Sequence, residues 1–374
     1  MKNNILSTLF VGIDVSSKIN VLCALDFKGN KLLNLKALNN NPGAESMSKS
    51  ILECLISNNL KYVVIAMEST SVYSVHVANF LSSYEYLALF EPKVYCLNPK
   101  TIVNYRKSFV DMDKTDPLDA FVIADFARCG RISSSPWRGS QFLALQRLTR
   151  HRLHLVECIT REKTYMVTNM YLKFSQLATL DKEDRPFSNK YGATATAVLS
   201  LDDITYSSIE DLVDFVKEKG KNRFSDPHVT AKLLKKAARD SYRLDEVLYE
   251  PLNISISSSF NLISAFEREI KTIDKAIERN IKGINTTEYQ SLRSIPGIGP
   301  VLASGILAEI GSITAFKSHN ALAKYAGLTW RVNQSGNHTS DETNMTKTGN
   351  KYLRYYLIEA ANSVKNNLPE YNEY

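Results

Sequence analysis

The sequence lacks the marks of a secreted, disulfide-bonded or membrane-spanning protein. Its five cysteines are scattered, with no CxxC pair, so neither a disulfide framework nor a structural zinc site is indicated. The N-terminus has no apolar signal-peptide core, and no later run approaches the ~20 apolar residues that a membrane span needs. We therefore expect a soluble cytoplasmic protein with reduced thiols and no membrane partner.

Positive charge is present only in small excess. The 46 Lys and Arg residues against 39 Asp and Glu residues give a net charge of +7, which is compatible with a polyanionic partner but does not identify one. A composition of 44% hydrophobic and 23% charged residues excludes a disordered or collagen-like chain. A chain of 374 residues is long enough for two or three domains, each with its own core.

The N-terminal part alternates between strand and helix patterns. A turn at residues 26–30 joins two of the strands as a hairpin, and a continuous apolar run at 62–67 is typical of a buried strand. The order β-β-β-α-β-α-β-α indicates an α/β domain with a mixed sheet, which we place at residues 1–130. The expected strands are residues 9–13, 19–25, 32–38, 62–67 and 87–90, and the expected helices are 43–56, 72–81 and the segments on either side of 112–115.

The middle of the chain, residues 131–285, reads as helical. Two apolar stripes with spacings of 3, 4 and 7 predict two long helices, the second at about 259–282, that flank a polar insert at 177–251. We expect an antiparallel coiled-coil arm carrying a small helical subdomain. The stripes are formed by Leu148, Leu155, Ile159, Met166 and Met170, and by Ile263, Phe266, Ile270, Ile273 and Ile277.

The last part, residues 286–374, is helical with glycine-rich turns. Pro296, Gly297 and Gly299 lie in a Pro-Gly-Ile-Gly-Pro turn of the helix-hairpin-helix kind, in which backbone amides at a helix N-terminus approach a DNA phosphate. A plain helix–helix turn explains the same residues equally well. Five basic residues are either phosphate contacts or solvated helix charge: Lys324, Arg331, Lys347, Lys351 and Arg354.

A serine in a glycine-bearing loop follows one of these arginines. Ser335 could attack phosphorus if its proton is removed and the phosphate charge is neutralised nearby, although most Ser-Gly pairs are turns. His338 is either a proton acceptor for that serine or an exposed loop histidine. His151 and His154 have no third ligand and indicate no metal site.

Two carboxylates stand at strand ends. Asp14 ends the first strand and Glu68 ends the buried strand, where the sheet would fix them well for holding a divalent cation. Each could instead face solvent or cap the next helix.

Two further acids, Asp116 and Asp119, are spaced to share one face of a helix. With Pro117 as the first helical residue, Asp116 would be the N-cap and Asp119 the third helical residue, which is a capping box and a serious alternative to metal binding. Acids at the ends of strands one and four and on a later helix are nevertheless where a ribonuclease H-like fold assembles a two-metal phosphodiester site. Oxygen ligands of this kind suit Mg²⁺ or Mn²⁺.

The ordered motifs of the chain, from about residue 10 to residue 361, closely resemble those of the IS110 family of insertion-sequence transposases. The motifs are Gly-Ile-Asp-Val-Ser, Met-Glu-Ser-Thr-Ser-Val-Tyr, Lys-Thr-Asp-Pro-Leu-Asp-Ala, Ile-Pro-Gly-Ile-Gly-Pro, Tyr-Ala-Gly-Leu, Gln-Ser-Gly and Lys-Thr-Gly-Asn-Lys-Tyr-Leu-Arg.

The resemblance implies a RuvC-like domain whose DEDD acids bind Mg²⁺ and a C-terminal transposase domain whose catalytic serine is Ser335. It further implies strand exchange through a 5′-phosphoserine, in a composite site between protomers, on donor and target DNA chosen by a non-coding bridge RNA. The coiled-coil arm would form a homodimer that assembles into a tetramer, on DNA in the bacterial nucleoid. Asp111 and Asp113 lie close enough to Asp116 for the ligand assignment to slip. The DEDD acids map to Asp14, Glu68, Asp116 and Asp119.

Three other functions stay open from the residues. A RuvC-like nuclease would use metal and water without the serine, and a DNA-binding scaffold would have no catalytic metal. An actin-like ATPase or sugar kinase also opens with Gly-Ile-Asp on a first strand, but its glycine-rich phosphate hairpins are missing here.

Overall fold

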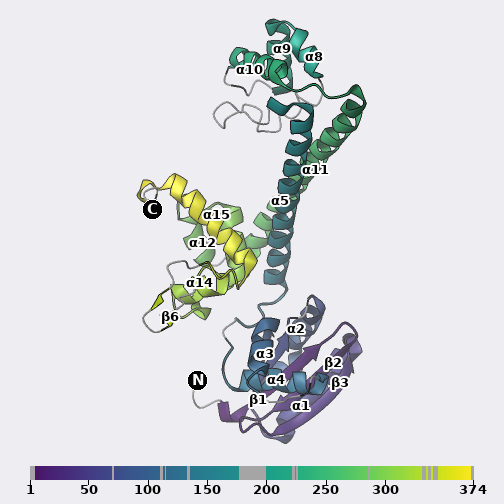
Figure 1. Ribbon diagram of the computed structural model, residues 1–374. Coiled ribbons are helices and arrows are strands. Elements are labelled where there is room, and N and C mark those ends of the chain that lie inside the picture. The colour runs from purple at the N-terminus through teal and green to yellow at the C-terminus, as the bar shows by residue number, and fades with distance from the viewer. Residues whose placement is uncertain are drawn as a thin grey trace. The chain divides into compact units, whose positions relative to one another are not determined.

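The chain folds into two compact units, residues 1–147 with 280–374 and residues 148–279 (Figure 1). The computed structural model describes residues 5–69, 71–109, 113, 115–132, 135–176, 199–220, 224, 226–284, 287–330, 334–335, 338–339 and 344–371. The division into domains at residues 130 and 285 stays a prediction.

The N-terminal domain is built on a five-stranded mixed sheet of order β3-β2-β1-β4-β5. Strands β1 (Thr8–Val15), β2 (Ile19–Leu25) and β3 (Lys31–Leu38) form an antiparallel meander. Strands β4 (Tyr62–Glu68) and β5 (Lys93–Leu97) add in parallel on the other side of β1. This order and these directions are those of the RNase H-like fold, with β1 at the centre of the sheet.

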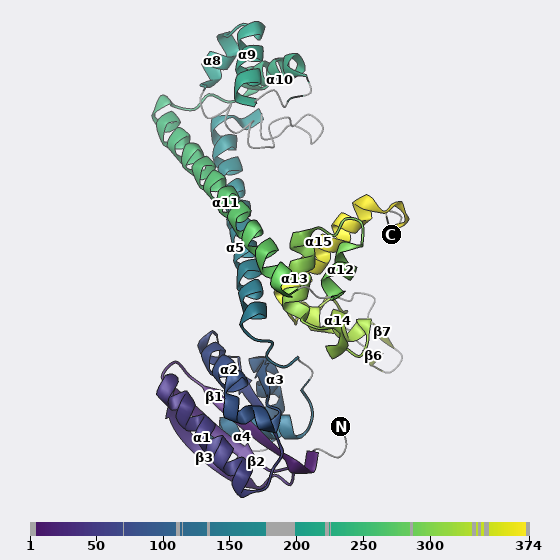
Figure 2. The same cartoon turned by 180° about the vertical axis from the view of Figure 1, so that it is seen from behind.

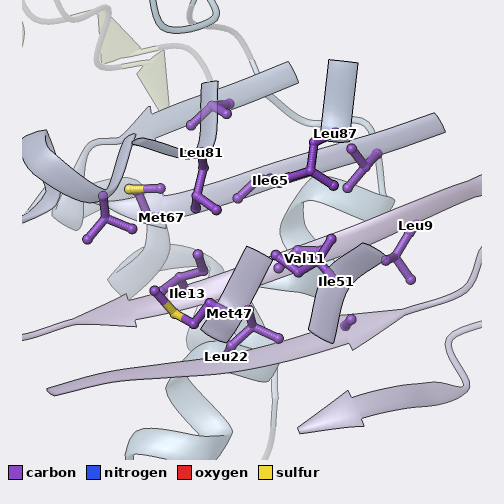
Figure 3. Packing of buried hydrophobic residues seen from close by; sticks show 14 of the residues in the cluster. Leu9, Val11, Ile13, Leu22, Met47, Ile51, Ile65, Met67, Leu81 and Leu87 are labelled. Carbon is purple, nitrogen blue, oxygen red and sulfur yellow. The ribbon is translucent and has the colours of Figure 1, made fainter. Parts of the chain in front are cut away.

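Helices α1 (Asn41–Ser57) and α2 (Tyr73–Ser83) cover one face of the sheet. Every second residue of β1 points into this core, as Figure 3 shows for Leu9, Val11 and Ile13. All three side chains are fully buried, and burying an aliphatic side chain of this size contributes roughly 1.5–3 kcal/mol. The alternation leaves the even-numbered residues of β1 for the opposite face.

Helix α4 (Asp116–Arg128) lies against that opposite face, next to α3 (Pro99–Arg106). The helix crosses β1 at Gly12, where an added Cβ would collide with the backbone of Ala120 and Ala124. Only glycine allows this approach, so Gly12 sets the distance between α4 and the strand.

The strand expected at residues 87–90 is wrong. Residues Glu85–Phe90 form a short 3₁₀ turn, and the fifth strand follows it as β5. In the turn Leu87 is buried whereas Leu89 is 85% exposed. A short apolar run of this kind fits both a strand and a turn. In the structure the strand is formed instead by β5, whose Val94 and Leu97 are buried in the core.

The unit of residues 148–279 contains two long helices that run antiparallel. Arg152 on α5 (Ser140–Lys173) contacts Asp274 on α11 (Tyr249–Ile284) with 2.6 Å between Nε and Oδ1. Lys173 donates a hydrogen bond of 2.6 Å to Asn253, so numbers rise on one helix as they fall on the other. Both predicted helices are therefore present and paired.

The second long helix begins at Tyr249 rather than at the expected residue 259. Pro251, placed in the insert by the sequence, lies in the first turn of α11, where a proline removes no helical hydrogen bond. The described part of the insert is helical as expected, and residues 177–198 lie outside the described residues. Its helices are α8 (Leu201–Tyr206), α9 (Ile209–Gly220) and α10 (Pro227–Asp240), shown in Figure 2.

The C-terminal part is also helical, and its core is formed around Ile306, Leu353 and Tyr356, all of them buried. None of the helices in the described ranges is long and apolar enough to cross a membrane. The C-terminal helices are α12 (Thr287–Arg293), α13 (Pro300–Ile310), α14 (His319–Ala326) and α15 (Lys351–Asn367).

The packing at Gly12 predicts a large effect of the Gly12→Ala substitution. A methyl group would force α4 away from β1, so we expect a loss of free energy of unfolding near the upper end of the ~1–3 kcal/mol typical of overpacked cores. Urea unfolding followed by circular dichroism measures it. The control is Gly283→Ala, near the end of α11, whose added Cβ meets nothing within 4 Å and which should not destabilise the protein. An unchanged midpoint for Gly12→Ala would contradict the close packing.

Lys173 predicts a pH dependence in the unit of residues 148–279. Burial lowers the pKa of Lys173 to about 8, against a weaker opposing effect of Asp203, whereas a lysine in the unfolded chain titrates near ~10.4. The unfolded state then binds more protons between these values, so stability rises with pH from about 8 to ~10.4. The unfolding midpoint of the wild type should therefore rise relative to that of Lys173→Met as the pH increases across this window. A difference independent of pH would show that Lys173 titrates normally.

Candidate active site

Asp14 and Glu68 lie side by side at the carboxyl ends of two parallel strands. Gly12 of β1 pairs with Ala66 of β4, so two residues further along Asp14 stands beside Glu68. Neighbouring strands are ~4.8 Å apart. Ala66 packs in the core beneath α4, and alternate residues share a face, so both carboxylates belong to the α4 side of the sheet. Both residues are half-buried.

Helix α4 brings Asp119 to the same face of the sheet. The next residue, Ala120, packs on Gly12 of β1. Asp119 therefore lies close to the strand that carries Asp14. Asp116, at the first position of α4, is exposed, whereas Asp119 is half-buried.

The carboxylate of Asp119 forms an ion pair with Arg106, at the end of α3. The same guanidinium donates a hydrogen bond of 2.6 Å from Nη2 to the backbone carbonyl of Asp113. The two side chains of the pair are 19% and 24% exposed, so this contact is better shielded from solvent than an ordinary surface ion pair.

The capping box that is the alternative explanation of Asp116 and Asp119 is not formed. Thr115, in extended conformation, is the N-cap, and it makes no side-chain capping bond. Asp116 is therefore the first helical residue rather than the cap, and the N–H of Asp119 donates to the carbonyl of Thr115 at 2.9 Å. The acids of α4 are thus not explained by capping. Of the two nearby acids, Asp113 is exposed and Asp111 lies outside the described residues.

The donor set suits a hard divalent cation. Asp14, Glu68 and Asp119 offer carboxylate oxygens only, the ligands that Mg²⁺ and Mn²⁺ prefer. Among the described residues, however, no three acidic, histidine or cysteine side chains are close enough together to hold a metal ion. In the structure the carboxylate of Asp119 contacts the guanidinium of Arg106 instead of a metal-sized cluster of acids.

The ion pair predicts energetic coupling between its two residues. In metal-free buffer, Arg106→Ala and Asp119→Asn should each destabilise the domain, and the double variant should lose less than the sum, with a coupling energy on the order of 1 kcal/mol. Urea unfolding of the four proteins in EDTA gives the cycle. Additive losses would mean that the pair contributes nothing to stability.

The backbone around Ser335 is a small hairpin. Strands β6 (Gln334–Ser335) and β7 (His338–Thr339) pair antiparallel, with Ser335 opposite His338. Arg331, expected as a phosphate contact, lies outside the described residues.

The expected helix-hairpin-helix glycines have different surroundings. Gly297 has φ +91°, and an added Cβ would lie 2.8 Å from the carbonyl oxygen of Ser363 on α15, whose hydroxyl donates to the Gly297 carbonyl at 2.6 Å. Gly297 is therefore required for packing. Gly299 is the N-cap of α13 with open space around it, and Pro296 is exposed.

The basic residues also divide into two kinds. Lys324, Lys347 and Lys351 are exposed. Arg354 is half-buried, and its Nη1 donates to the carbonyls of Ala326 at 3.0 Å and Lys347 at 3.1 Å. A structural use of Arg354 is thus evident, while phosphate binding by any of the four stays a prediction.

Two positions that shape the acidic site had no signal in the sequence. Gly12 lies inside the Gly-Ile-Asp-Val-Ser motif, but its role depends on where α4 crosses the sheet. Arg106 pairs with a residue 13 positions away and on another helix, outside the reach of helical spacing rules.

The strand order, with acids at the ends of β1 and β4 and on α4, defines an RNase H-like domain with an acidic site. The comparisons with known proteins narrow this class. Residues 11–174 match a family model described as "Transposase", built on the DEDD transposases of IS110, and residues 289–374 match the model "Transposase IS116/IS110/IS902 family". The two segments take in about two thirds of the chain. The chain belongs to the IS110 family of transposases.

Three individual proteins with similar sequences are a protein of an insertion element and two transposases. The IS116 uncharacterized 44.8 kDa protein of Streptomyces clavuligerus is 22% identical over 363 residues, covering 95% of this chain and 84% of that protein. A probable family 20 transposase of Pseudomonas aeruginosa is 29% identical over 102 residues, 27% of this chain and 29% of the relative. The transposase for insertion sequence element IS1111A of Coxiella burnetii is 32% identical over 102 residues, 27% of this chain and 25% of the relative. The chain thus spans only about a quarter of the length of the last two relatives.

Among solved structures, T. thermophilus RuvC in complex with a Holliday junction substrate matches with 14% identity and a TM-score of 0.26, over 35% of this chain and 99% of that one. A score this low adds nothing to the strand order, on which the RNase H-like assignment rests.

Proposed function

We propose that the protein is a transposase that cuts and rejoins the DNA strands of an insertion sequence. The observation that carries the proposal is the parallel register of β1 and β4, which puts Asp14 and Glu68 at neighbouring strand ends on the face against which α4, the helix of Asp119, packs. The family membership of the chain supports the same function.

Asp14, Glu68, Asp116 and Asp119 would hold Mg²⁺ or Mn²⁺. Such an ion, when bound, stabilises negative charge on the attacking and leaving oxygens of a phosphoryl transfer. The protein's own part is positioning, since the sheet fixes the first two carboxylates and α4 supplies the others. Asp119 would share its carboxylate between the ion and Arg106, or release Arg106.

Ser335 is the proposed nucleophile. Its hydroxyl oxygen would form a bond to phosphorus while the bond from phosphorus to the 3′ oxygen breaks, which leaves a 5′-phosphoserine and a free 3′-hydroxyl. The serine proton leaves to a base as the 3′ oxygen gains one, so atoms and charge balance. The register partner of Ser335, His338, is one group that could accept the proton.

The partners proposed are donor DNA, target DNA and a structured bridge RNA. The long helices α5 and α11 would act as a coiled-coil arm that joins two protomers, with the dimer assembling into a tetramer. The turn around Gly299 would approach a DNA phosphate in the manner of a helix-hairpin-helix. The serine of one protomer would then meet the acids of another. Family resemblance supports these points.

A structure-specific nuclease without serine chemistry is the second candidate. It is favoured by one observation, that Asp14 and Glu68 end neighbouring parallel strands on the face against which α4 packs, an arrangement that would serve metal-dependent hydrolysis without Ser335. A metal-bound water would replace the serine in such an enzyme.

Substitution of the acids tests the metal-dependent part of the proposal. Asp14→Ala, Glu68→Ala and Asp119→Ala should each lower strand exchange by more than about 100-fold, as removal of a group that stabilises charge in a transition state does. Folding should change little in Asp14→Ala and Glu68→Ala, and Asp119→Ala should lose in addition only the stability of its ion pair with Arg106, on the order of 1 kcal/mol. The matched control is Glu53→Ala, an exposed acid on α1, which should retain full activity. Strand exchange at wild-type rate by any of the three acid variants would contradict the assignment.

Ser335→Ala separates the two candidates. The transposase should lose the covalent protein–DNA adduct, which is detected as a shifted band on a denaturing gel with labelled DNA, together with strand exchange. A nuclease that uses water would keep cutting DNA in this variant. Continued joining by Ser335→Ala would exclude the phosphoserine step.

A further inference from the structure

Trp330 is a large aromatic side chain left on the surface beside the hairpin of Ser335. It is 60% exposed, although burying an indole is strongly favourable. Its backbone forms an isolated antiparallel bridge with Met345. The two residues therefore mark the base of the segment that carries Ser335.

This base is firmly built. The N–H of Thr346 donates to the carbonyl of Thr329 at 2.8 Å, and the two threonine hydroxyls are 3.2 Å apart. Just below, Arg354 joins the carbonyls of Ala326 and Lys347. Because these contacts fix the backbone before Trp330 and the segment that pairs with it, the backbone that carries the indole loses little freedom when a ligand binds.

Two exposed lysines, Lys347 and Lys351, follow the bridging Met345 closely in the sequence. Lys347 is two residues from the bridging Met345, roughly 7 Å along an extended chain, and it is exposed. Lys351, also exposed, begins α15 soon after it. The acid Glu309 accepts a hydrogen bond of 2.6 Å from Asn350, just before Lys351, but its side chain is buried, whereas the two lysines are exposed.

We propose that Trp330 stacks on an unpaired base of the DNA strand that reaches Ser335, while Lys347 and Lys351 contact its phosphates. An aromatic face combined with ammonium groups matches a single strand, whose bases are planar and whose backbone is anionic. An apolar protein surface would use the indole but not the lysines. The choice of DNA rests on the proposed function.

Tryptophan fluorescence tests the contact directly. The chain has two tryptophans, so in a Trp137→Phe background the emission comes from Trp330 alone. We expect quenching on titration with a single-stranded DNA oligonucleotide in EDTA, and much less with the same strand made abasic, which keeps the phosphates. Equal quenching by both strands would overturn the stacking.

Affinity gives the second readout, by fluorescence anisotropy of labelled DNA. Trp330→Ala and Trp330→Leu should each weaken single-strand binding about tenfold or more, and Trp330→Tyr should keep most of it. The control is Tyr206→Ala, an aromatic that is 83% exposed on α8, which should bind normally. Lys347→Ala should reduce the salt dependence of binding, because it removes a phosphate contact.

The outcomes distinguish this inference from the function on which it rests. Unchanged affinity of Trp330→Ala in a protein that exchanges strands would overturn the stacking and leave the transposase standing. No DNA binding by the wild type would overturn both. Quenching by RNA but not by DNA would overturn the choice of DNA, and a change in oligomer mass without a change in DNA affinity would identify a protein contact instead.

Discussion

The close crossing of α4 over β1 at Gly12 is the constraint on which the N-terminal site depends. Because no side chain separates the two backbones, the helix lies directly on the strand that ends in Asp14. The acid of α4 is then carried to the sheet edge where β1 and β4 bring their own acids together. A helix held one side-chain layer further out would leave Asp119 remote from both, so the glycine serves the site without contacting it.

The same convergence creates an electrostatic difficulty. Half-buried carboxylates on one face repel one another and lose part of their hydration, so the arrangement favours a cation. Arg106 supplies one positive charge to Asp119 within the chain. Without metal, the carboxylate of Asp119 is paired with the guanidinium of Arg106. Binding of a metal ion would need at least one oxygen of the same carboxylate, so the ion and Arg106 compete for Asp119.

Much of the N-terminal fold could be predicted from the sequence, because its signals are local. Strands β1, β2, β3 and β4 are apolar runs of strand length, and acids at the ends of β1 and β4 follow from the runs themselves. The errors arise where local signals are ambiguous. The apolar run at 87–90 forms a 3₁₀ turn in which Leu89 is exposed, and the N-cap of α4 is Thr115, one residue before the expected Asp116. Gly12 and Arg106 act through contacts between elements, which spacing along the chain does not reveal.

In the C-terminal part, two residues from motifs typical of nucleic-acid binding have structural roles. Gly297 and Arg354 occur in segments typical of nucleic-acid contacts, yet each is engaged inside the fold, Gly297 against α15 and Arg354 on two carbonyls. Arg354 donates to the carbonyl of Lys347, so it helps to fix the backbone from which the exposed Lys347 side chain extends. The small excess of +7 in the whole chain understates the local field. Acids lie at the ends of β1 and β4, whereas Lys347 and Lys351 are exposed close in sequence to the residue that pairs with Trp330, so one net charge for the whole chain describes neither region.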